Sequence, residues 1–372
     1  MVDNPSAQPV LDRRRAGVLL HPTSLPAGDL GDDARRFVDF LANCGFTVWQ
    51  CLPLGPTHDD GSPYHALSAH AGNPSLISLS RLRAWGWLNS DAVSSVAEGL
   101  TTAHREVLAD AAVRQEYGTC LERERAWLDD YALFSVLREK LHHVPWWQWP
   151  AALRDHEPSA LAEVRVSLAD ALESVRFGQF IFDRQWRELR AYAHEHGVRL
   201  FGDMPIFVAH DSADVWANRA LFRLEASGQP SVVAGVPPDY FSAEGQRWGN
   251  PLYDWKAIEA DGFNWWVARL RTELRRFDLL RVDHFRGFEA CWEIPANEAT
   301  AIHGHWSPVP GERLFERLRE EFGALPLVAE DLGHITPAVH ALRQRFGLPG
   351  MRVLQFAFDG GADNPYLPHA HT

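Results

Sequence analysis

Lysine is almost missing from this chain of 372 residues. Lys140 and Lys256 are the two that occur, although lysine and arginine together number 36. The pattern G-x-x-x-x-G-K-[ST] does not occur either, which excludes a P-loop nucleotide site. We attribute the excess of arginine to coding bias. The 49 acidic residues leave a net charge of −13, which argues against a nucleic-acid groove and against binding to an anionic membrane surface.

Cysteine and long apolar runs are also scarce. The four cysteines show neither a C-x-x-C pair nor a spacing with histidine that suits zinc. Together with a start that lacks the apolar run of a secretory signal peptide, this predicts a protein of the reduced cytoplasm. The apolar runs are too short to span a membrane. The 18 histidines contain no H-E-x-x-H or comparable ligand spacing, so we expect no metal site.

Short apolar runs alternate with helical patterns along most of the chain. This alternation predicts an α/β fold with a parallel sheet and crossover helices, of which a (β/α)₈ barrel is one form. Helices are expected at 32–43, 264–277 and 310–322. The strands are expected at 16–20, 47–54, 199–208, 279–285, 327–332 and 352–358.

The pattern also suggests a domain organisation. Residues 1–15 are predicted to form a flexible arm, 16–83 the first two barrel strands, and 84–175 an inserted helical subdomain. Residues 176–372 would then carry barrel strands three to six. Within that part, 225–255 is rich in Gly, Pro, Asn and Ser, which is typical of a long functional loop.

Three acidic residues lie on three different predicted strands. In Leu279–Phe285, alternation along the strand puts Arg281 and Asp283 on one face, with His284 on the other. An arginine beside a carboxylate stabilises its charged form, as a nucleophile requires, although a buried structural ion pair has the same spacing. Glu330 ends the apolar run 327–329, where an apolar setting suits a general acid. Asp203 lies within a third apolar run, Leu200–Phe207. Burying three unpaired carboxylates is costly, so their joint occurrence favours a site, and paired carboxylates are the groups that cleave glycosidic bonds.

Aromatic side chains supply candidate platforms for sugar rings. The chain has 15 tryptophans, and Trp and Tyr combine a flat apolar face with a polar edge. Each candidate could instead be an ordinary loop anchor. Tyr64 follows the second predicted strand. Trp248 clusters with the polar residues Asp239, Gln246 and Asn250 in 225–255, which favours a binding role.

Ten ordered stretches identify a resemblance that runs from about residue 16 to the end. The chain resembles the 4-α-glucanotransferases, also called amylomaltases or disproportionating enzymes, of glycoside hydrolase family 77. The stretches are His21–Leu25, Leu52–Pro56, Ser62–Tyr64, Ala71–Pro74, Gly202–Phe207, Gly235–Phe241, Gln246–Pro251, Arg281–Phe288, Ala329–Gly333 and Gly347–Met351.

The resemblance implies a (β/α)₈ barrel with helical insertions and a reaction that needs no metal or organic cofactor. It also implies transfer of an α-1,4-glucan segment from a maltooligosaccharide, starch or glycogen-derived glucan to the 4-hydroxyl of another glucan or of glucose, with retention. Asp283 matches the nucleophile, Glu330 the general acid/base and Arg281 the residue that orients the nucleophile. Retaining chemistry predicts carboxyl groups roughly 5–5.5 Å apart. The residues that match or adjoin the glucan path are Tyr64, Asp203, Asp239, Gln246, Trp248, Asn250 and His284.

Some positions depart from the family pattern. His65 and His70 stand where the family commonly has glutamine and an aromatic residue. The strand that would carry a third carboxylate, in a Gly-Thr-His-Asp-Asn motif, does not occur before Thr372. We therefore expect a barrel that ends after about six strands, with reduced or no activity. An α-1,4-glucan hydrolase and a non-catalytic glucan-binding fragment remain the alternatives.

Overall fold

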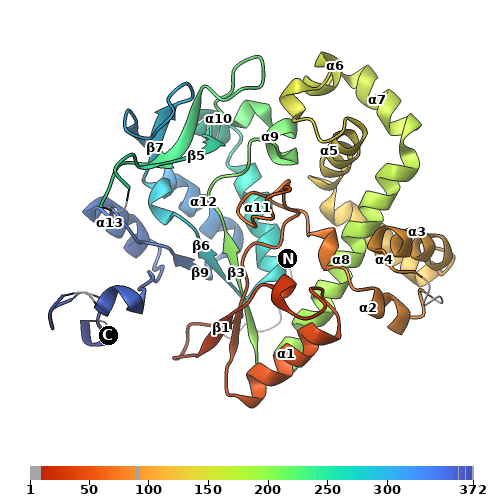
Figure 1. The fold of residues 1–372 in the computed structure, drawn as a ribbon, viewed down its shortest axis with the longest axis horizontal. Coiled ribbons are helices and arrows are strands. Elements are labelled where there is room, and N and C mark those ends of the chain that lie inside the picture. Colours follow the sequence, from red (N-terminus) through yellow and green to blue (C-terminus); the bar gives the residue numbers. More distant parts are fainter. Residues whose placement is uncertain (1–9, 89–92, 241, 359, 365, 371–372) are drawn as a thin grey trace.

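A five-stranded parallel sheet forms the centre of the computed structural model, which describes residues 10–370 except 89–92, 241, 359 and 365 (Figure 1). The strand order is β1-β2-β3-β6-β9, and each pair of neighbours is parallel. The prediction of an α/β fold with a parallel sheet is thereby confirmed, and five of the six expected strands lie where the sequence placed them. These are β1 (Gly17–Leu19), β2 (Val48–Gln50), β3 (Arg199–Met204), β6 (Leu279–Val282) and β9 (Leu327–Ala329).

The two faces of this sheet pack against different parts of the chain. Leu200, Leu280 and Leu327 belong to the main hydrophobic core, whereas Leu279 and Val328 form a small separate cluster. Val10 is also buried in this cluster, so our prediction of a flexible arm is wrong at that residue; residues 1–9 lie outside the described part. Alternation along the strands puts Asp203, Arg281 and Glu330 on the side of the small cluster.

Three expected helices form close to their predicted bounds: α1 (Asp32–Asn43), α11 (Asn264–Arg276) and α12 (Gly311–Phe322). In α12, Leu314, Phe315 and Leu318 are buried, the spacing of an apolar stripe along one helix face. Burial of such stripes against the sheet is what fixes these helices.

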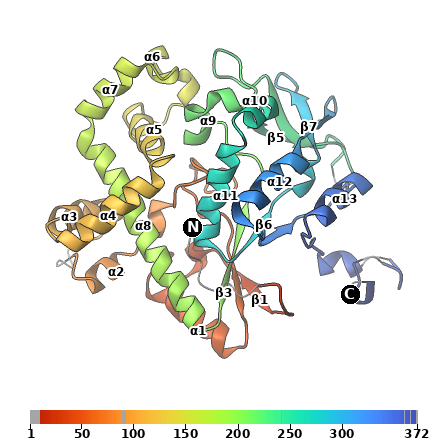
Figure 2. The same cartoon turned by 180° about the vertical axis from the view of Figure 1, so that it is seen from behind.

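Helices fill the chain between β2 and β3, and Figure 2 shows them to one side of the sheet. The longest, α8 (Ala169–Glu195), runs past this group and back to the start of β3. The others are α2 (Leu79–Ala84), α3 (Val96–Val107), α4 (Ala111–Glu124), α5 (Leu128–Lys140), α6 (Ala151–Arg154) and α7 (Pro158–Ser167).

A second, antiparallel sheet has the order β5-β4-β7-β8. Its strands are β4 (Val232–Val236), β5 (Gln246–Pro251), β7 (Ala290–Pro295) and β8 (His305–Pro308). The segment 225–255 is therefore not one long loop, as we expected. Gly235, Gly249 and Pro251 obscure these strands in the sequence, and pairing with the distant β7 stabilises them. The remaining helices are α9 (Ala213–Ala217), α10 (Trp255–Ala260) and α13 (Pro337–Arg345).

The sixth expected strand, 352–358, is absent: Leu354–Phe358 forms a 3₁₀ helix. The chain returns to the edge of β9, where the Ala329 N–H donates to the Pro349 carbonyl oxygen at 2.8 Å and Met351 packs against the cluster that contains Val328. Beyond it, Phe356 and Phe358 are exposed. An apolar run without a neighbouring strand has no ladder of hydrogen bonds to hold it extended. Within the described residues, helices that are both long and apolar enough to cross a membrane are lacking.

Candidate active site

The carboxyl ends of β3, β6 and β9 bring the predicted acidic residues together. Asp203 lies in β3 directly opposite Arg281 in β6. The Glu330 N–H donates to the Val282 carbonyl oxygen at 3.0 Å, which places Glu330 beside the end of β6. Because parallel strands all end at the same edge of a sheet, residues far apart in sequence meet there.

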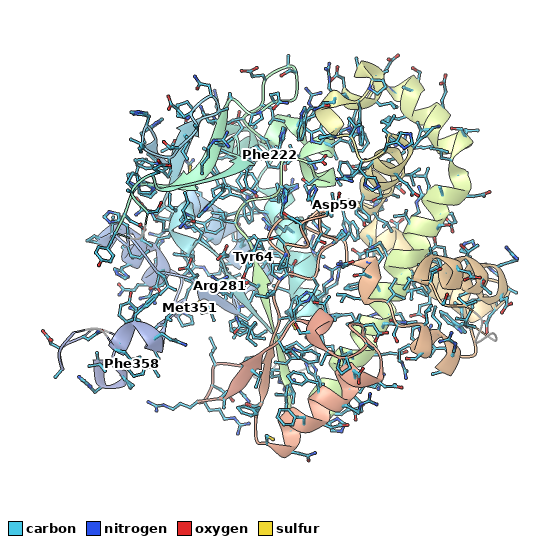
Figure 3. The ribbon with its side chains drawn as sticks, viewed as in Figure 1. Asp59, Tyr64, Phe222, Arg281, Met351 and Phe358 are labelled. Carbon is cyan, nitrogen blue, oxygen red and sulfur yellow. The ribbon has the colours of Figure 1, made fainter. Side chains whose placement is uncertain are left out.

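Asp203 is the buried centre of a hydrogen-bonded cluster. Its side chain is 1% exposed. The Arg281 Nη1 donates to its two oxygens at 2.8 and 3.0 Å, and the Tyr64 hydroxyl donates to Oδ2 at 2.7 Å. Burial raises the pKa of Asp203, and the arginine charge and these hydrogen bonds offset part of that rise. Figure 3 shows Tyr64 and Arg281 close together in the middle of the molecule.

Arg281 bridges two carboxylates that differ in their access to solvent. Its Nη2 lies 2.7 Å from Asp283 Oδ1, and the Asp283 side chain is 29% exposed. Burial opposes the guanidinium charge, but Asp203 and Asp283 outweigh it and raise the pKa of Arg281 above its ordinary value. Arg281 therefore stays charged and holds Asp283, the more accessible acid, in one orientation.

Glu330 is held by two backbone N–H groups. The Leu332 N–H donates to Oε1 at 2.8 Å, and the His284 N–H donates to Oε2 at 2.9 Å. Burial raises the pKa of Glu330, and the negative charge of Asp283 raises it further, although the two N–H groups favour the ionised form. A carboxyl group with a raised pKa next to one paired with arginine is the arrangement required of an acid and a nucleophile.

His284 and Trp248 form a second contact beside this cluster. Their rings are 4.8 Å apart and nearly perpendicular, at 86°. Trp248 is 39% exposed, and its Nε1 donates to the Gln246 side chain at 3.1 Å. His284 has a left-handed backbone, with φ of 51°, so strand alternation ends before it. Burial lowers the pKa of His284 to about 4, which keeps its ring neutral at pH 7.

Asn250 and Asp239, two further predicted site residues, have hydrogen-bond partners outside the cluster of carboxylates around Arg281. The Asn250 Nδ2 donates to the Val208 carbonyl oxygen at 2.8 Å, which ties β5 to the segment that follows β3. Asp239 lies on the exposed connection between β4 and β5, where its Oδ1 accepts from the Ser242 N–H at 2.8 Å. The cluster around Arg281 is built without either of them.

Sequence reasoning missed an arginine clamp, in which Arg269 of α11 holds two backbone carbonyl groups of the segment that follows β3. The buried Arg269 donates from Nη1 to the Ile206 carbonyl oxygen at 3.1 Å and from Nη2 to that of Pro205. The Tyr253 hydroxyl donates to the Ile206 oxygen at 2.7 Å. In the sequence, Arg269 looks like any other arginine of an amphipathic helix. Its contact with the backbone that follows β3 becomes visible only because the structure shows that it is buried.

Metal ligands are not grouped in the described part of the chain, where three or more His, Cys, Asp or Glu side chains do not come together in an arrangement that could hold an ion.

Two carboxyl groups at the ends of parallel strands, one half-buried with a raised pKa and one paired with arginine, are the arrangement expected in the class of enzymes that act on glycosidic bonds. The family model described as 4-alpha-glucanotransferase, of glycoside hydrolase family 77, matches residues 19–372. The 4-alpha-glucanotransferase of Thermus thermophilus is 50% identical over 375 residues, which is 96% of this chain and 75% of that relative. The relative from Synechocystis is 46% identical, over 98% of this chain and 77% of its own.

A solved structure of an amylomaltase is similar to this chain along nearly its whole length. The amylomaltase from Streptococcus agalactiae, in complex with acarbose, superposes with a TM-score of 0.90 and 36% identity, over 97% of this chain and 77% of that one. The chain belongs to the 4-alpha-glucanotransferase family.

Proposed function

We propose that this chain transfers α-1,4-glucan segments from a donor maltooligosaccharide to the 4-hydroxyl of an acceptor glucan or glucose, by a retaining double displacement. Family membership supports the transfer. The observation that carries the mechanism is the chain of contacts from Tyr64 through Asp203 and Arg281 to Asp283, beside the doubly held carboxyl group of Glu330.

In the first step, Glu330 donates its proton to the glycosidic oxygen and the bond from C1 to that oxygen breaks. A carboxylate oxygen of Asp283 forms a bond to C1, which gives a covalent glycosyl-enzyme. In the second step, ionised Glu330 takes the proton of the acceptor hydroxyl, whose oxygen attacks C1 and displaces Asp283. The raised pKa of Glu330 supports its acid role, and the pairing with Arg281 supports Asp283 as the nucleophile.

The residues around this pair would hold the glucan. Asp203, fixed by Tyr64 and Arg281, is suited to accept hydrogen bonds from sugar hydroxyls near the cleaved bond. Trp248, with Gln246 and the neutral His284 beside it, offers an accessible aromatic surface. Asp239 would contact the glucan from the exposed connection between β4 and β5. Because the amide nitrogen of Asn250 is committed to Val208, we assign Asn250 to the support of β5.

The parallel sheet would form part of a (β/α)₈ barrel. The strand order β1-β2-β3-β6-β9 follows the chain without a reversal, as in such a barrel. A reducing compartment such as the cytoplasm fits the four free cysteines.

The test is incubation with maltotriose followed by product sizing. Transfer gives glucose together with maltopentaose and longer chains. Glucose and maltose without longer products would indicate hydrolysis, and an unchanged sugar that still binds would indicate a binding protein. Asp283→Asn and Glu330→Gln should each abolish the long products, whereas the matched control Glu320→Gln, an exposed position on α12, should leave them unchanged.

A further inference from the structure

A cavity of about 430 Å³ lies between α5, α9 and α11, which Figure 2 shows as neighbours. The carboxylates of the proposed active site do not line it. Its volume lies within the range of small-molecule sites in proteins, and the proposed reaction makes no use of it.

Two buried polar side chains line this cavity. His70 and Asp214 are 3% and 5% exposed. His70 Nε2 and Asp214 Oδ1 are 3.9 Å apart, which is longer than a hydrogen bond. Asp214 Oδ2 accepts from the Ala69 N–H at 2.7 Å, and His70 Nδ1 lies 3.0 Å from Thr272 Oγ1. Thr272 Oγ1 donates to the Ala268 carbonyl oxygen at 3.2 Å, so it accepts from His70 Nδ1 and leaves Nε2 as an acceptor. Nε2 and Oδ1 are then two neighbouring acceptors, to which two adjacent hydroxyl groups of one ligand can donate.

The charge state of the buried pair suits a neutral ligand that donates hydrogen bonds. Burial lowers the pKa of His70 to about 3 and raises that of Asp214 to about 6. At pH 7 the ring is therefore neutral while most of the Asp214 population is ionised. A buried carboxylate is stabilised by every hydrogen bond that it gains.

The walls combine aromatic rings with amide and carboxyl groups. Trp127 stacks on His70 with ring centres 5.6 Å apart at 12°, and Trp265 meets His70 at 85°. Asn218 and Asn264 also line the cavity. Its carboxylates, from Asp130, Asp214 and Asp261, are balanced by one arginine in the wall and by Arg269, Arg275 and Arg276, whose charges act on His70, so the cavity favours a neutral ligand over an ion. Flat rings with amides and carboxylates match the apolar faces and hydroxyl groups of a sugar.

We propose that this cavity binds a neutral mono- or disaccharide at a site separate from the active site. The proposal concerns binding alone and does not depend on the proposed reaction. The site is placed to influence the reaction, since Ala268 in its wall precedes Arg269, which clamps the two carbonyl groups that follow Asp203 and Met204.

The test is a titration with glucose, which contains no glycosidic bond and therefore cannot react as a donor. The protein carries 5-fluorotryptophan, and ¹⁹F NMR resonances are assigned by single Trp→Phe replacements. We expect the resonances of Trp127 and Trp265 to shift as glucose is added. These shifts should saturate on a binding curve of their own, separate from the curve of the Trp248 resonance. In Ala217→Phe, which fills the cavity from α9, the shifts of Trp127 and Trp265 should fall at least tenfold while the Trp248 response persists.

The persistent Trp248 response also shows that the variant is folded. Should Ala217→Phe not fold, Asn264→Ala at the exposed rim of the cavity replaces it, with the same expectation. Ala112→Phe, an exposed position on α4 outside the cavity lining, is the matched control and should behave as the wild type. The proposal is overturned if glucose leaves Trp127 and Trp265 unmoved, or if the cavity variant responds as the wild type does. Choline in place of glucose should produce no shift, and a choline response without a glucose response also overturns it.

Discussion

The hydrogen bond from Tyr64 to Asp203 makes a direct test of how the site is organised. Tyr64→Phe removes one hydroxyl and leaves the ring in place, so Asp203 Oδ2 loses a donor at 2.7 Å. A hydrogen bond to a charged acceptor contributes about 1.5–3 kcal/mol. If this energy orients Asp203 toward the sugar in the transition state, kcat/KM should fall about 10- to 150-fold, since 1.36 kcal/mol corresponds to a factor of ten.

A second readout separates this function from a merely structural one. The Tyr64 hydroxyl lowers the pKa of Asp203 and so opposes the effect of burial. Its removal should raise that pKa, so that a higher pH is needed to ionise Asp203 and the acid limb of the rate profile moves upward. The assay is the initial rate of glucose release from maltotriose at a series of pH values.

The chain provides a matched control in Tyr192, whose hydroxyl donates to Asp39 at 2.6 Å between α8 and α1. Tyr192→Phe removes the same kind of hydrogen bond outside the site and should leave both the rate and its pH profile unchanged. A Tyr64→Phe enzyme with wild-type kcat/KM and an unmoved acid limb would refute this account of Asp203.

Three other predictions follow from the same structure. Glu330→Gln should lower kcat/KM on maltotriose about 10²- to 10⁴-fold; a glycosyl fluoride donor, whose leaving group needs no proton, should restore glycosyl-enzyme formation in this variant but not in an Asp283 variant. Gly202→Ala should destabilise the protein by about 1–3 kcal/mol in urea unfolding, because a Cβ there would lie 2.4 Å from the Phe277 ring; Gly118→Ala, with open space in α4, should instead stabilise it by about 0.5–1 kcal/mol. Burial lowers the pKa of His210 to about 4, so the unfolded chain binds more protons between pH 6.5 and 4 and stability falls as the pH falls; His210→Phe should make the thermal midpoint less steeply dependent on pH in that window.

The meeting of the acidic residues at the carboxyl ends of β3, β6 and β9 could be predicted, because the apolar runs that mark these strands can be read from local sequence. The apolar runs before Asp203, Asp283 and Glu330 are short strands, and strand ends in a parallel sheet converge whatever lies between them. The resemblance to a known family then supplied roles that spacing alone left open.

The second sheet and the clamp could not be predicted in the same way. β5 has the sequence of a polar turn and is a strand because β4 pairs with it, and β4 in turn pairs with β7, far along the chain. The predicted strand at 352–358 shows the converse, since its apolar residues lack a neighbouring strand. Arg269 was missed because a helical pattern does not show which arginine is buried.

The hydrogen bond between His284 and Glu330 has a mechanical consequence. The N–H that holds Glu330 Oε2 belongs to the peptide bond that joins Asp283 to His284. That peptide unit is planar and stiff, so the acid that would donate the proton is tethered, through one hydrogen bond, to the main chain of the residue that would attack. A shift of the loop after β6 would therefore carry both groups together, and their spacing would vary less than the position of either one. Replacing the His284 side chain leaves this tether in place, because the tether is made by the backbone.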